Sequence, residues 1–160
     1  MGLICHLHRL LFLFAVLLLG AGCTLSASYV PDPTPSPRGE AVVQSARTQI
    51  GKPYKWGGIS PKTGFDCSGY VYWAYQQNGI KVPRSTADQA KVGRTVPRSG
   101  LRPGDIVVFS PRWQRSKHTG IYSGKGKFLH SPKTGSRIRE DSIDAKHWIE
   151  CFDNGRRLFD

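Results

Sequence analysis

A single cysteine and two histidines stand where they could support nucleophilic catalysis. Cys67 directly follows Asp66, a residue type that caps the start of helices, and apolar residues at helical spacing come after it. Unpaired N–H groups and the positive dipole end at a helix start stabilise a thiolate, the form of cysteine that attacks a carbonyl carbon. Such a nucleophile also needs a general base and a group that orients the base. His118 and His130 are the candidates for these two roles.

A structural role for Cys67 is the alternative. In an oxidising compartment two remaining cysteines usually form a disulfide, and Cys151 is the available partner. The position at the helix start favours the nucleophile, because a structural cysteine is expected in the middle of a helix, on its apolar face. The sequence therefore predicts a free Cys67 thiol that is not bridged to Cys151.

The two histidines belong to one predicted β-hairpin. His118 opens the segment "HTGIY", His130 closes the segment "KFLH", and "SGKG" joins them. Directly opposed residues of an antiparallel pair share one face of the sheet. An odd-length loop, or a one-residue bulge at a glycine, places both histidines on the same face, whereas a two-residue loop separates them. Without Cys67, two unrelated histidines at strand ends would be the preferred interpretation.

Three helices are expected to position the nucleophile. The first covers 38–51, with a glycine at its end and one apolar face. That face consists of Val42, Val43, Ala46 and Ile50. The second starts after Asp66 and ends at Asn78-Gly79, and its apolar stripe consists of Tyr70, Val71, Ala74 and Tyr75. A short third helix begins in "RSTADQA", where Ser85 and Asp88 have the spacing of a capping box.

The pattern changes from helical to strand-like after residue 100. β-branched and alternating segments separated by Gly and Pro predict strands within 101–110, 118–131, 135–141 and 148–152. Helices followed by a run of strands are typical of an α+β domain, with the helices packed on an antiparallel sheet.

The first part of the chain has the composition of an export signal. Residues 1–22 combine Arg9 with an apolar run that is too short to span a bilayer comfortably. Cys23 then predicts a lipoprotein-type signal peptide with a lipidated cysteine, and the alternative is an ordinary signal peptide cut near Ala21 or Ala27. Prolines at alternate positions make 23–38 an extended linker. The folded domain is expected over 39–160.

The chain is strongly basic, with 23 Lys and Arg against 11 Asp and Glu and a formal net charge of +12. Such a charge favours an anionic partner, for example lipid head groups or peptides rich in carboxylates. Nucleic acid is not expected, because the export signal argues against it and the basic residues are scattered along the chain.

Six separated segments resemble the NlpC-type cell-wall cysteine peptidases, a papain-like family of exported bacterial enzymes. In the order of that family they are "GKPYKWGG", "FDCSGYVYWAY", "VPRSTADQ", "LRPGDIVVF", "KHTGIYSG" and "FLHSPKTG". The resemblance covers essentially all of 40–155. A lipid anchor followed by one such domain is similar to the small lipoprotein members of the family.

The resemblance implies roles for the candidate residues. Cys67 would be the nucleophile, His118 the base that later protonates the leaving amine, and His130 the group that orients His118. Tyr54 would place its hydroxyl near the oxyanion, beside the Cys67 backbone N–H. The groove for the substrate would be lined by Asp66, Ser68, Arg84 and Ser85. Asp66 and Ser85 would also cap helices, whether or not they contact substrate.

Other residues have simpler structural interpretations. Trp56 and Trp73 are expected in the core and not as platforms for sugar rings. Asp105, in "RPGD", is typical of a turn. Cys151 is expected to be a small buried apolar residue.

The sequence thus predicts a peptidoglycan hydrolase that cuts an amide bond in stem peptides or their cross-links through a Cys-His-His triad and a thioester. No metal or cofactor is expected. The protein would be a monomer, anchored by lipid to a membrane of the cell envelope, most simply the outer membrane facing the periplasm. Two alternatives are a catalytically silent wall-binding lipoprotein and an acyltransferase on a papain-like scaffold.

Overall fold

The computed structural model describes residues 36–112 and 116–159. The expected signal peptide over 1–22, the lipidation at Cys23 and the linker up to residue 35 lie outside the described residues. The first described helix, α2 (Pro37–Arg47), begins with two residues that the sequence assigned to the end of the linker. The side chain of Ser36 caps it by accepting a hydrogen bond from the Gly39 N–H.

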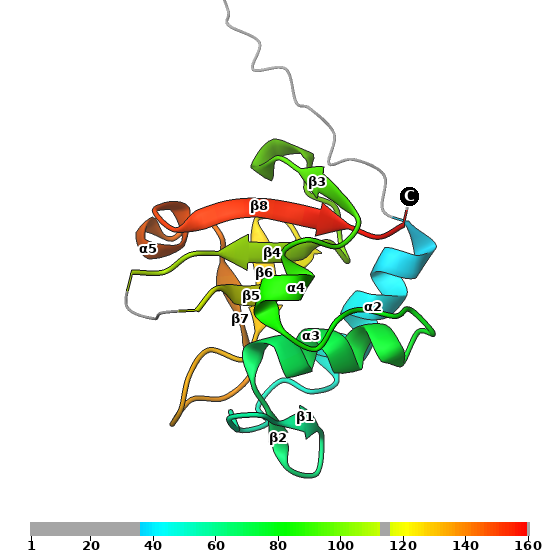
Figure 1. Cartoon of the computed structure of the whole chain (residues 1–160), viewed down its shortest axis with the longest axis vertical. Coiled ribbons are helices and arrows are strands. Elements are labelled where there is room, and N and C mark those ends of the chain that lie inside the picture. Colours follow the sequence, from blue (N-terminus) through cyan, green and yellow to red (C-terminus); the bar gives the residue numbers. More distant parts are fainter. Residues whose placement is uncertain (1–35, 113–115, 160) are drawn as a thin grey trace, which may run out of the picture. The chain divides into compact units, whose positions relative to one another are not determined.

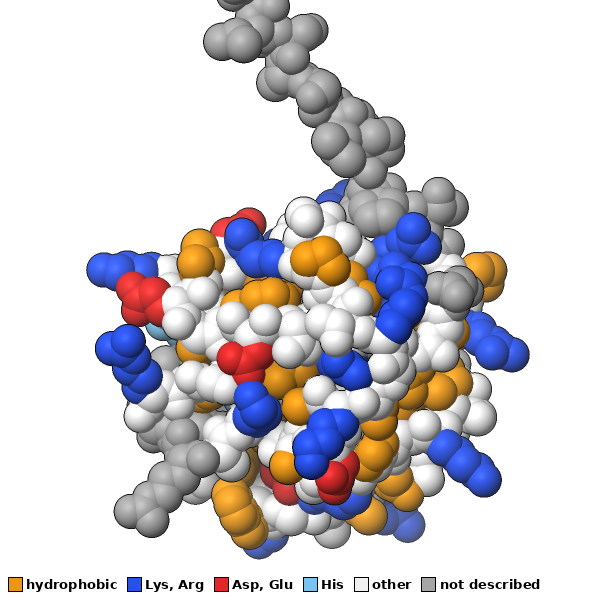
Figure 2. Space-filling model, turned by 45° about the horizontal axis from the view of Figure 1, so that its top comes forward, with side chains coloured by type: hydrophobic (Ala, Val, Ile, Leu, Met, Phe, Trp, Pro, Cys, Tyr) orange, Lys and Arg blue, Asp and Glu red, His pale blue; other side chains and the backbone are white. Residues whose placement is uncertain are grey.

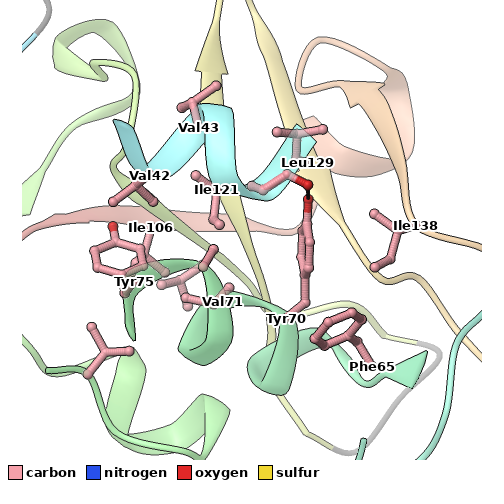
Figure 3. Close-up of a cluster of buried hydrophobic side chains, with 14 residues drawn as sticks. Val42, Val43, Phe65, Tyr70, Val71, Tyr75, Ile106, Ile121, Leu129 and Ile138 are labelled. Carbon is pink, nitrogen blue, oxygen red and sulfur yellow. Dashed lines mark hydrogen bonds between the residues drawn. The ribbon is translucent and has the colours of Figure 1, made fainter. Parts of the chain in front are cut away.

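Two helices form one layer of the domain (Figure 1). In α2 the expected face is buried at three positions, while Ile50 lies beyond the end of the helix and is 49% exposed. The second helix, α3 (Cys67–Gln76), buries its whole apolar stripe. Figure 3 shows the Tyr70 ring reaching from α3 to α2, where its hydroxyl donates to the Ala46 carbonyl at 2.9 Å.

The second layer is a six-stranded sheet in which all pairs are antiparallel. Its order is β3-β8-β4-β5-β6-β7. The strands are β3 (Arg94–Val96), β4 (Ile106–Phe109), β5 (His118–Gly124), β6 (Lys127–His130), β7 (Arg139–Ser142) and β8 (Phe152–Arg157). A two-stranded sheet of β1 (Ile59–Ser60) and β2 (Gly64–Phe65) precedes α3, and the short helices are α4 (Thr86–Gln89), the 3-10 turn η1 (Arg98–Gly100) and α5 (Lys146–Ile149). The α+β prediction is confirmed.

Strand β4 separates two hydrophobic cores. Ile106 and Val108 face α2 and α3, whereas Val107 and Phe109 face the other side, as the two-residue period of a strand requires. The first core is shown in Figure 3, and the second is closed by Trp148 of α5. Because both faces of the sheet are covered, β4 reads in sequence as a continuous apolar run.

The β5–β6 hairpin brings both histidines to one face through a bulge. Ile121 pairs with Leu129, and the register shifts by one residue between Tyr122 and Gly124. Continued along the strands, this register places Gly120 opposite His130, so His118 stands two residues further along on the same face. A Cβ on Gly120 would lie 3.2 Å from the His130 Cβ, and the glycine therefore leaves room for the His130 ring.

The strand expected over 148–152 is wrong except at its last residue. Trp148 and Ile149 belong to α5, and β8 begins only at Phe152. Trp148 and Cys151 are buried in the second core without extended backbone, whereas Ile149 is 49% exposed, so an apolar run does not by itself specify a strand. The strand expected over 135–141 is shorter than predicted, because β7 starts at Arg139.

Asp105 does more than form a turn. It accepts a hydrogen bond from the Arg102 N–H at 2.8 Å, as a turn residue would. Its two carboxylate oxygens also bind the Arg157 guanidinium, at 2.7 and 2.6 Å, and both side chains are almost fully buried. The pair therefore ties β8 to the turn before β4.

Figure 2 shows Lys and Arg side chains spread over the visible face, with few Asp and Glu among them. This agrees with the scattered positive charge of the sequence. Within 36–112 and 116–159, the structure contains no helix with the length and apolarity needed to cross a membrane.

Candidate active site

Asp66 organises the start of α3 around Cys67. Its Oδ1 accepts a hydrogen bond from the Gly69 N–H at 2.7 Å, which is the predicted cap, and its Oδ2 accepts one from the Gly57 N–H at 3.0 Å. A Cβ on Gly69 would lie 2.0 Å from the Gly58 carbonyl oxygen. The loop before β1 therefore packs directly on the first turn of α3, and only glycine fits there.

Arg84 links Asp66 and Ser68 from the segment before α4. Its guanidinium binds both Asp66 oxygens, at 3.0 and 2.6 Å, and donates to the Ser68 hydroxyl at 2.8 Å. Ser68 is buried, whereas the Arg84 side chain is 37% exposed. Ser85 is exposed and caps α4 with the predicted Asp88 partner. The expected groove residues thus lie together, with Ser68 beneath the surface.

The two histidines are joined ring to ring beneath an aromatic cover. His118 Nε2 and His130 Nδ1 lie 2.9 Å apart, and the two side chains are 2% and 0% exposed. Trp148 stacks on the His118 ring, with centroids 5.5 Å apart and planes at 26°. Phe109 and Phe128 pack against the same group. Burial lowers the pKa of His118 well below its ordinary 6.5, and His130 lowers that pKa further.

The Cys67 thiol lies beside the beginning of β5. Its sulfur takes part in a hydrogen bond with the backbone of Thr119, the residue after His118. Since Nε2 of His118 is engaged by His130, Nδ1 is the ring nitrogen left to exchange a proton with Cys67. Both Cys67 and Cys151 are free, which confirms the predicted absence of a bridge. Cys151 is buried in the second core, also as expected.

Gln89 connects the segment of Cys67 to the strand of His118. It is fully buried, and its Nε2 donates to the Ser68 and Pro83 carbonyls, both at 2.9 Å. Its Oε1 accepts a hydrogen bond from the Thr119 hydroxyl at 2.8 Å. Ser68 and Thr119 are the residues next to Cys67 and His118, so Gln89 holds the two reactive side chains at a fixed separation.

The expected lowering of the Cys67 pKa is wrong in direction. Backbone hydrogen bonds with Thr119 and Ser68 do lower the pKa of the thiol, but burial raises it more and the Asp66 carboxylate adds to the rise. A thiolate alone and an imidazolium alone are both disfavoured at this position. The anion is therefore expected to form together with the His118 cation, as a pair.

This arrangement predicts a broad pH optimum. The pKa of His118 lies well below 6.5 and that of Cys67 above 9.0, and the active form keeps one proton on this pair. We expect kcat/KM for peptide hydrolysis to be constant between about pH 6.5 and 9, with the acid limb below this window and the basic limb above it. The profile is measured on a short stem peptide. An acid limb whose midpoint lies at pH 6.5 or above would contradict the direction of the His118 shift.

Tyr54 lies close enough to the nucleophile for the two groups to interact electrostatically. Burial raises the pKa of its hydroxyl, and Cys67 and Asp66 raise it further. The hydroxyl is therefore a stable hydrogen-bond donor at neutral pH. Trp56, two residues later, is 82% exposed, so its expected place in the core is wrong. Trp73 packs edge-on against Phe65 beside the first core, as expected.

Three residues near the site were not identified from the sequence. Gln89 donates to the carbonyl of Ser68, next to Cys67, and Trp148 stacks on the ring of His118. The Asp141 Oδ2 lies 3.0 Å from the His130 Nε2. Each acts across a distance in sequence that no local pattern encodes. The alternation in "GSRIRED" was the one available signal, because it placed Asp141 at the end of a strand that could pair with β6.

Comparison with known proteins places this geometry in a family. The sequence profile of the NlpC/P60 family matches residues 51–157. The chain is 43% identical over 114 residues to the murein DD-endopeptidase MepH of Escherichia coli, an alignment covering 69% of this chain and 42% of the relative. It is 45% identical over 103 residues to a gamma-D-glutamyl-L-lysine dipeptidyl-peptidase of Bacillus subtilis, covering 62% and 34%.

A solved structure agrees with the sequence relatives. An NlpC/P60 family protein from Bacillus cereus superposes with a TM-score of 0.70 at 30% identity, over 79% of this chain and 41% of that one. The chain spans less than half the length of each of these curated relatives.

Proposed function

The chain belongs to the NlpC/P60 family, and on this basis we propose that it is a cysteine peptidase that hydrolyses an amide bond in peptidoglycan stem peptides or their cross-links. The observation that carries the proposal is the pair of bonded histidines, His118 and His130, beside the thiol at the start of α3. The substrate class follows from relatives whose names specify a murein endopeptidase and a glutamyl-lysine peptidase.

The first chemical step forms a thioester. His118 Nδ1 takes the proton of Cys67, and the sulfur attacks the amide carbon to give a tetrahedral oxyanion. The Cys67 N–H and the Tyr54 hydroxyl donate hydrogen bonds to that oxygen. Each such donor lowers the activation barrier by about 3–4 kcal/mol. His118 then protonates the amine nitrogen as the C–N bond breaks, which leaves the thioester. This acid–base help contributes roughly 10²–10⁴-fold in rate.

Hydrolysis of the thioester uses the same groups. His118, neutral again after releasing its proton to the amine, removes a proton from water as the water attacks the thioester carbon. The second oxyanion occupies the same two donors. Collapse of this intermediate breaks the C–S bond, and the thiolate recovers its proton from His118. His130 orients the His118 ring in both steps.

The groove residues are suited to a charged peptide. Arg84 offers its exposed side to a substrate carboxylate while Asp66 and Ser68 hold its guanidinium in place. Ser85 is exposed beside it at the start of α4. Asp66 retains its capping role in this scheme, so its substitution would disturb the position of Cys67 as well as the groove.

The proposal includes export and attachment to the cell envelope. Residues 1–22 would be removed and Cys23 lipidated, so that the linker from Cys23 to the start of α2 holds the domain away from the membrane, facing the wall. The protein would act as a monomer. Mass spectrometry of the mature amino terminus tests the lipid, because an unmodified terminus near Ala21 or Ala27 would exclude it.

Product analysis in H₂¹⁸O tests the reaction class and the bond. We expect purified muropeptides to yield new amines and new carboxyl groups carrying one ¹⁸O atom, and the fragment masses identify the cleaved bond. An acyltransferase would give amide-linked products without the isotope, and a wall-binding protein would leave the muropeptides intact. Either result would overturn the proposed hydrolysis. A parallel digest in ordinary water corrects for natural isotopes.

A further inference from the structure

The outer nitrogen of His130 faces a carboxylate. The Asp141 Oδ2 lies 3.0 Å from His130 Nε2, and the Asp141 side chain is 20% exposed whereas that of His130 is fully buried. In the β6–β7 ladder Phe128 pairs with Asp141 and His130 with Arg139. Asp141 therefore stands diagonally across from His130, on the same face of the sheet.

Arg139 keeps Asp141 ionised. Its Nε donates to Oδ1 at 2.8 Å and its terminal nitrogen donates to Oδ2 at 3.0 Å, which is the two-pronged geometry of a strong arginine–carboxylate pair. The hydrogen bond from His130 and the Arg139 charge hold the pKa of the Asp141 carboxyl far below its ordinary value. Asp141 is thus an acceptor only, at any pH near neutral.

We propose that Asp141 is a positioning residue that extends the triad to four groups, by fixing which nitrogen of each histidine carries the proton. The proposal rests on the proposed peptidase function. A carboxylate has no hydrogen to donate, so the proton of the Asp141–His130 bond belongs to His130 Nε2. Neutral His130 then has a bare Nδ1, which can only accept.

The same logic passes to the base. Since His130 Nδ1 accepts, the proton in the His118–His130 bond belongs to His118 Nε2. Neutral His118 is left with a bare Nδ1 as the only place for the Cys67 proton. An amide side chain at the position of His130 could accept the His118 proton through its carbonyl oxygen and would need no further partner. A histidine has two ring nitrogens, so a second group must determine which of them carries the proton. Asp141 is that group.

Asp141 also stabilises the charge that forms during the reaction. When His118 accepts the thiol proton, its cation is favoured by Asp141 and opposed by burial and by His130. On His130 the charges of Arg139 and His147 act against a cation, and Asp141 acts for it. Around the sulfur, burial and the Asp66 charge act against the anion, and backbone hydrogen bonds with Thr119 and Ser68 act for it. Among the charged side chains named here, Asp141 is the one that favours transfer of the proton to the histidines.

Asp141→Asn tests the role, with Glu140→Gln as the matched control. Both changes remove one negative charge from adjacent positions of β7, but Glu140 points to the opposite face, where it binds Ser123 and Arg47. We expect Asp141→Asn to lower kcat about 10- to 100-fold with KM unchanged, by analogy with the carboxylates that orient metal-bound histidines, whose removal has effects of this size. The acid limb of the kcat/KM profile should also move to lower pH, because the His118 cation loses its counter-charge. Glu140→Gln should change neither.

Nitrogen NMR of the histidine rings gives a second test that needs no substrate. In the wild-type full-length chain near neutral pH, we expect the neutral rings of both His118 and His130 to carry their protons on Nε2. A His130 proton on Nδ1 would overturn the proposal, even if Asp141→Asn folds poorly. Equal kcat and an unmoved acid limb in Asp141→Asn and Glu140→Gln would also overturn it. If the wild type cuts no muropeptide, the peptidase function fails by itself, while the ring spectra still decide the proton positions.

Discussion

Cys67→Ala is expected to lower kcat/KM for muropeptide cleavage by at least about 10⁴-fold, to the level of the background reaction. The reason is that, in the proposed mechanism, Cys67 alone forms the covalent intermediate, so its loss leaves His118, His130 and the oxyanion donors without a nucleophile. Cys67→Ser should recover little of this loss, because a hydroxyl in this position is far less acidic than a thiol and burial already disfavours the anion. The measurement is the initial rate of amine release from a purified stem peptide.

Cys151→Ala is the matched control for this prediction. Cys151 is the second free cysteine among the described residues, and its thiol contacts the His147 carbonyl in the second core. The control should retain the wild-type rate and lose only a little stability, on the order of 1 kcal/mol. A Cys67→Ala protein that keeps more than a tenth of the wild-type rate would eliminate the thioester mechanism.

Asp105→Ala is expected to produce the largest loss of stability, about 3–5 kcal/mol in the free energy of unfolding. The substitution removes the Asp105 carboxylate, the counter-charge of the buried Arg157 guanidinium, while the bond from Arg157 to the Gly100 carbonyl at 2.7 Å stays. A buried charge that loses its counter-charge costs far more than a missing surface contact. Urea denaturation followed by circular dichroism gives the free energy by linear extrapolation.

Asp144→Ala is the matched control, because it removes an exposed ion pair instead of a buried one. Asp144 pairs with Arg98 at the surface, where the two side chains are 60% and 42% exposed. Water solvates both charges there, so the expected loss is at most about 1 kcal/mol. Equal losses in the two variants would show that burial of the Asp105–Arg157 pair does not matter. Replacing Asp105 and Arg157 together by apolar residues should recover part of the stability, because no charge is then left unpaired.

The features that could be predicted from sequence are those with local causes. The cap at Asp66 and the Ser85–Asp88 capping box each lie within one turn of helix, the apolar stripe of α3 lies within two turns, and the structure confirms them. The hairpin was also local, because a glycine-rich turn of a few residues determines the face on which His118 and His130 lie.

The features that could not be predicted depend on pairing over long distances. Asp105 and Arg157 are 52 residues apart, and the residues next to each of them contain no pattern that predicts this pair. Trp148 was read as part of a strand, because an apolar run signals burial without specifying the backbone. The pKa of Cys67 was predicted from the helix start alone, while the burial that dominates it comes from the rest of the fold.

The clamp formed by Gln89 has a consequence for how the chain acquires reactivity. The helix with Cys67 and the hairpin with His118 are each short-range structures, which we expect to form early, whereas the bond from Thr119 to Gln89 closes a longer loop and is expected to form late. A chain in which only the short-range parts have folded therefore contains an ordinary thiol and an ordinary imidazole that do not act on one another. In refolding experiments, peptidase activity should return with the final cooperative phase and not with the recovery of helix content. The reactivity of Cys67 is in this sense expected to depend on completion of the tertiary fold.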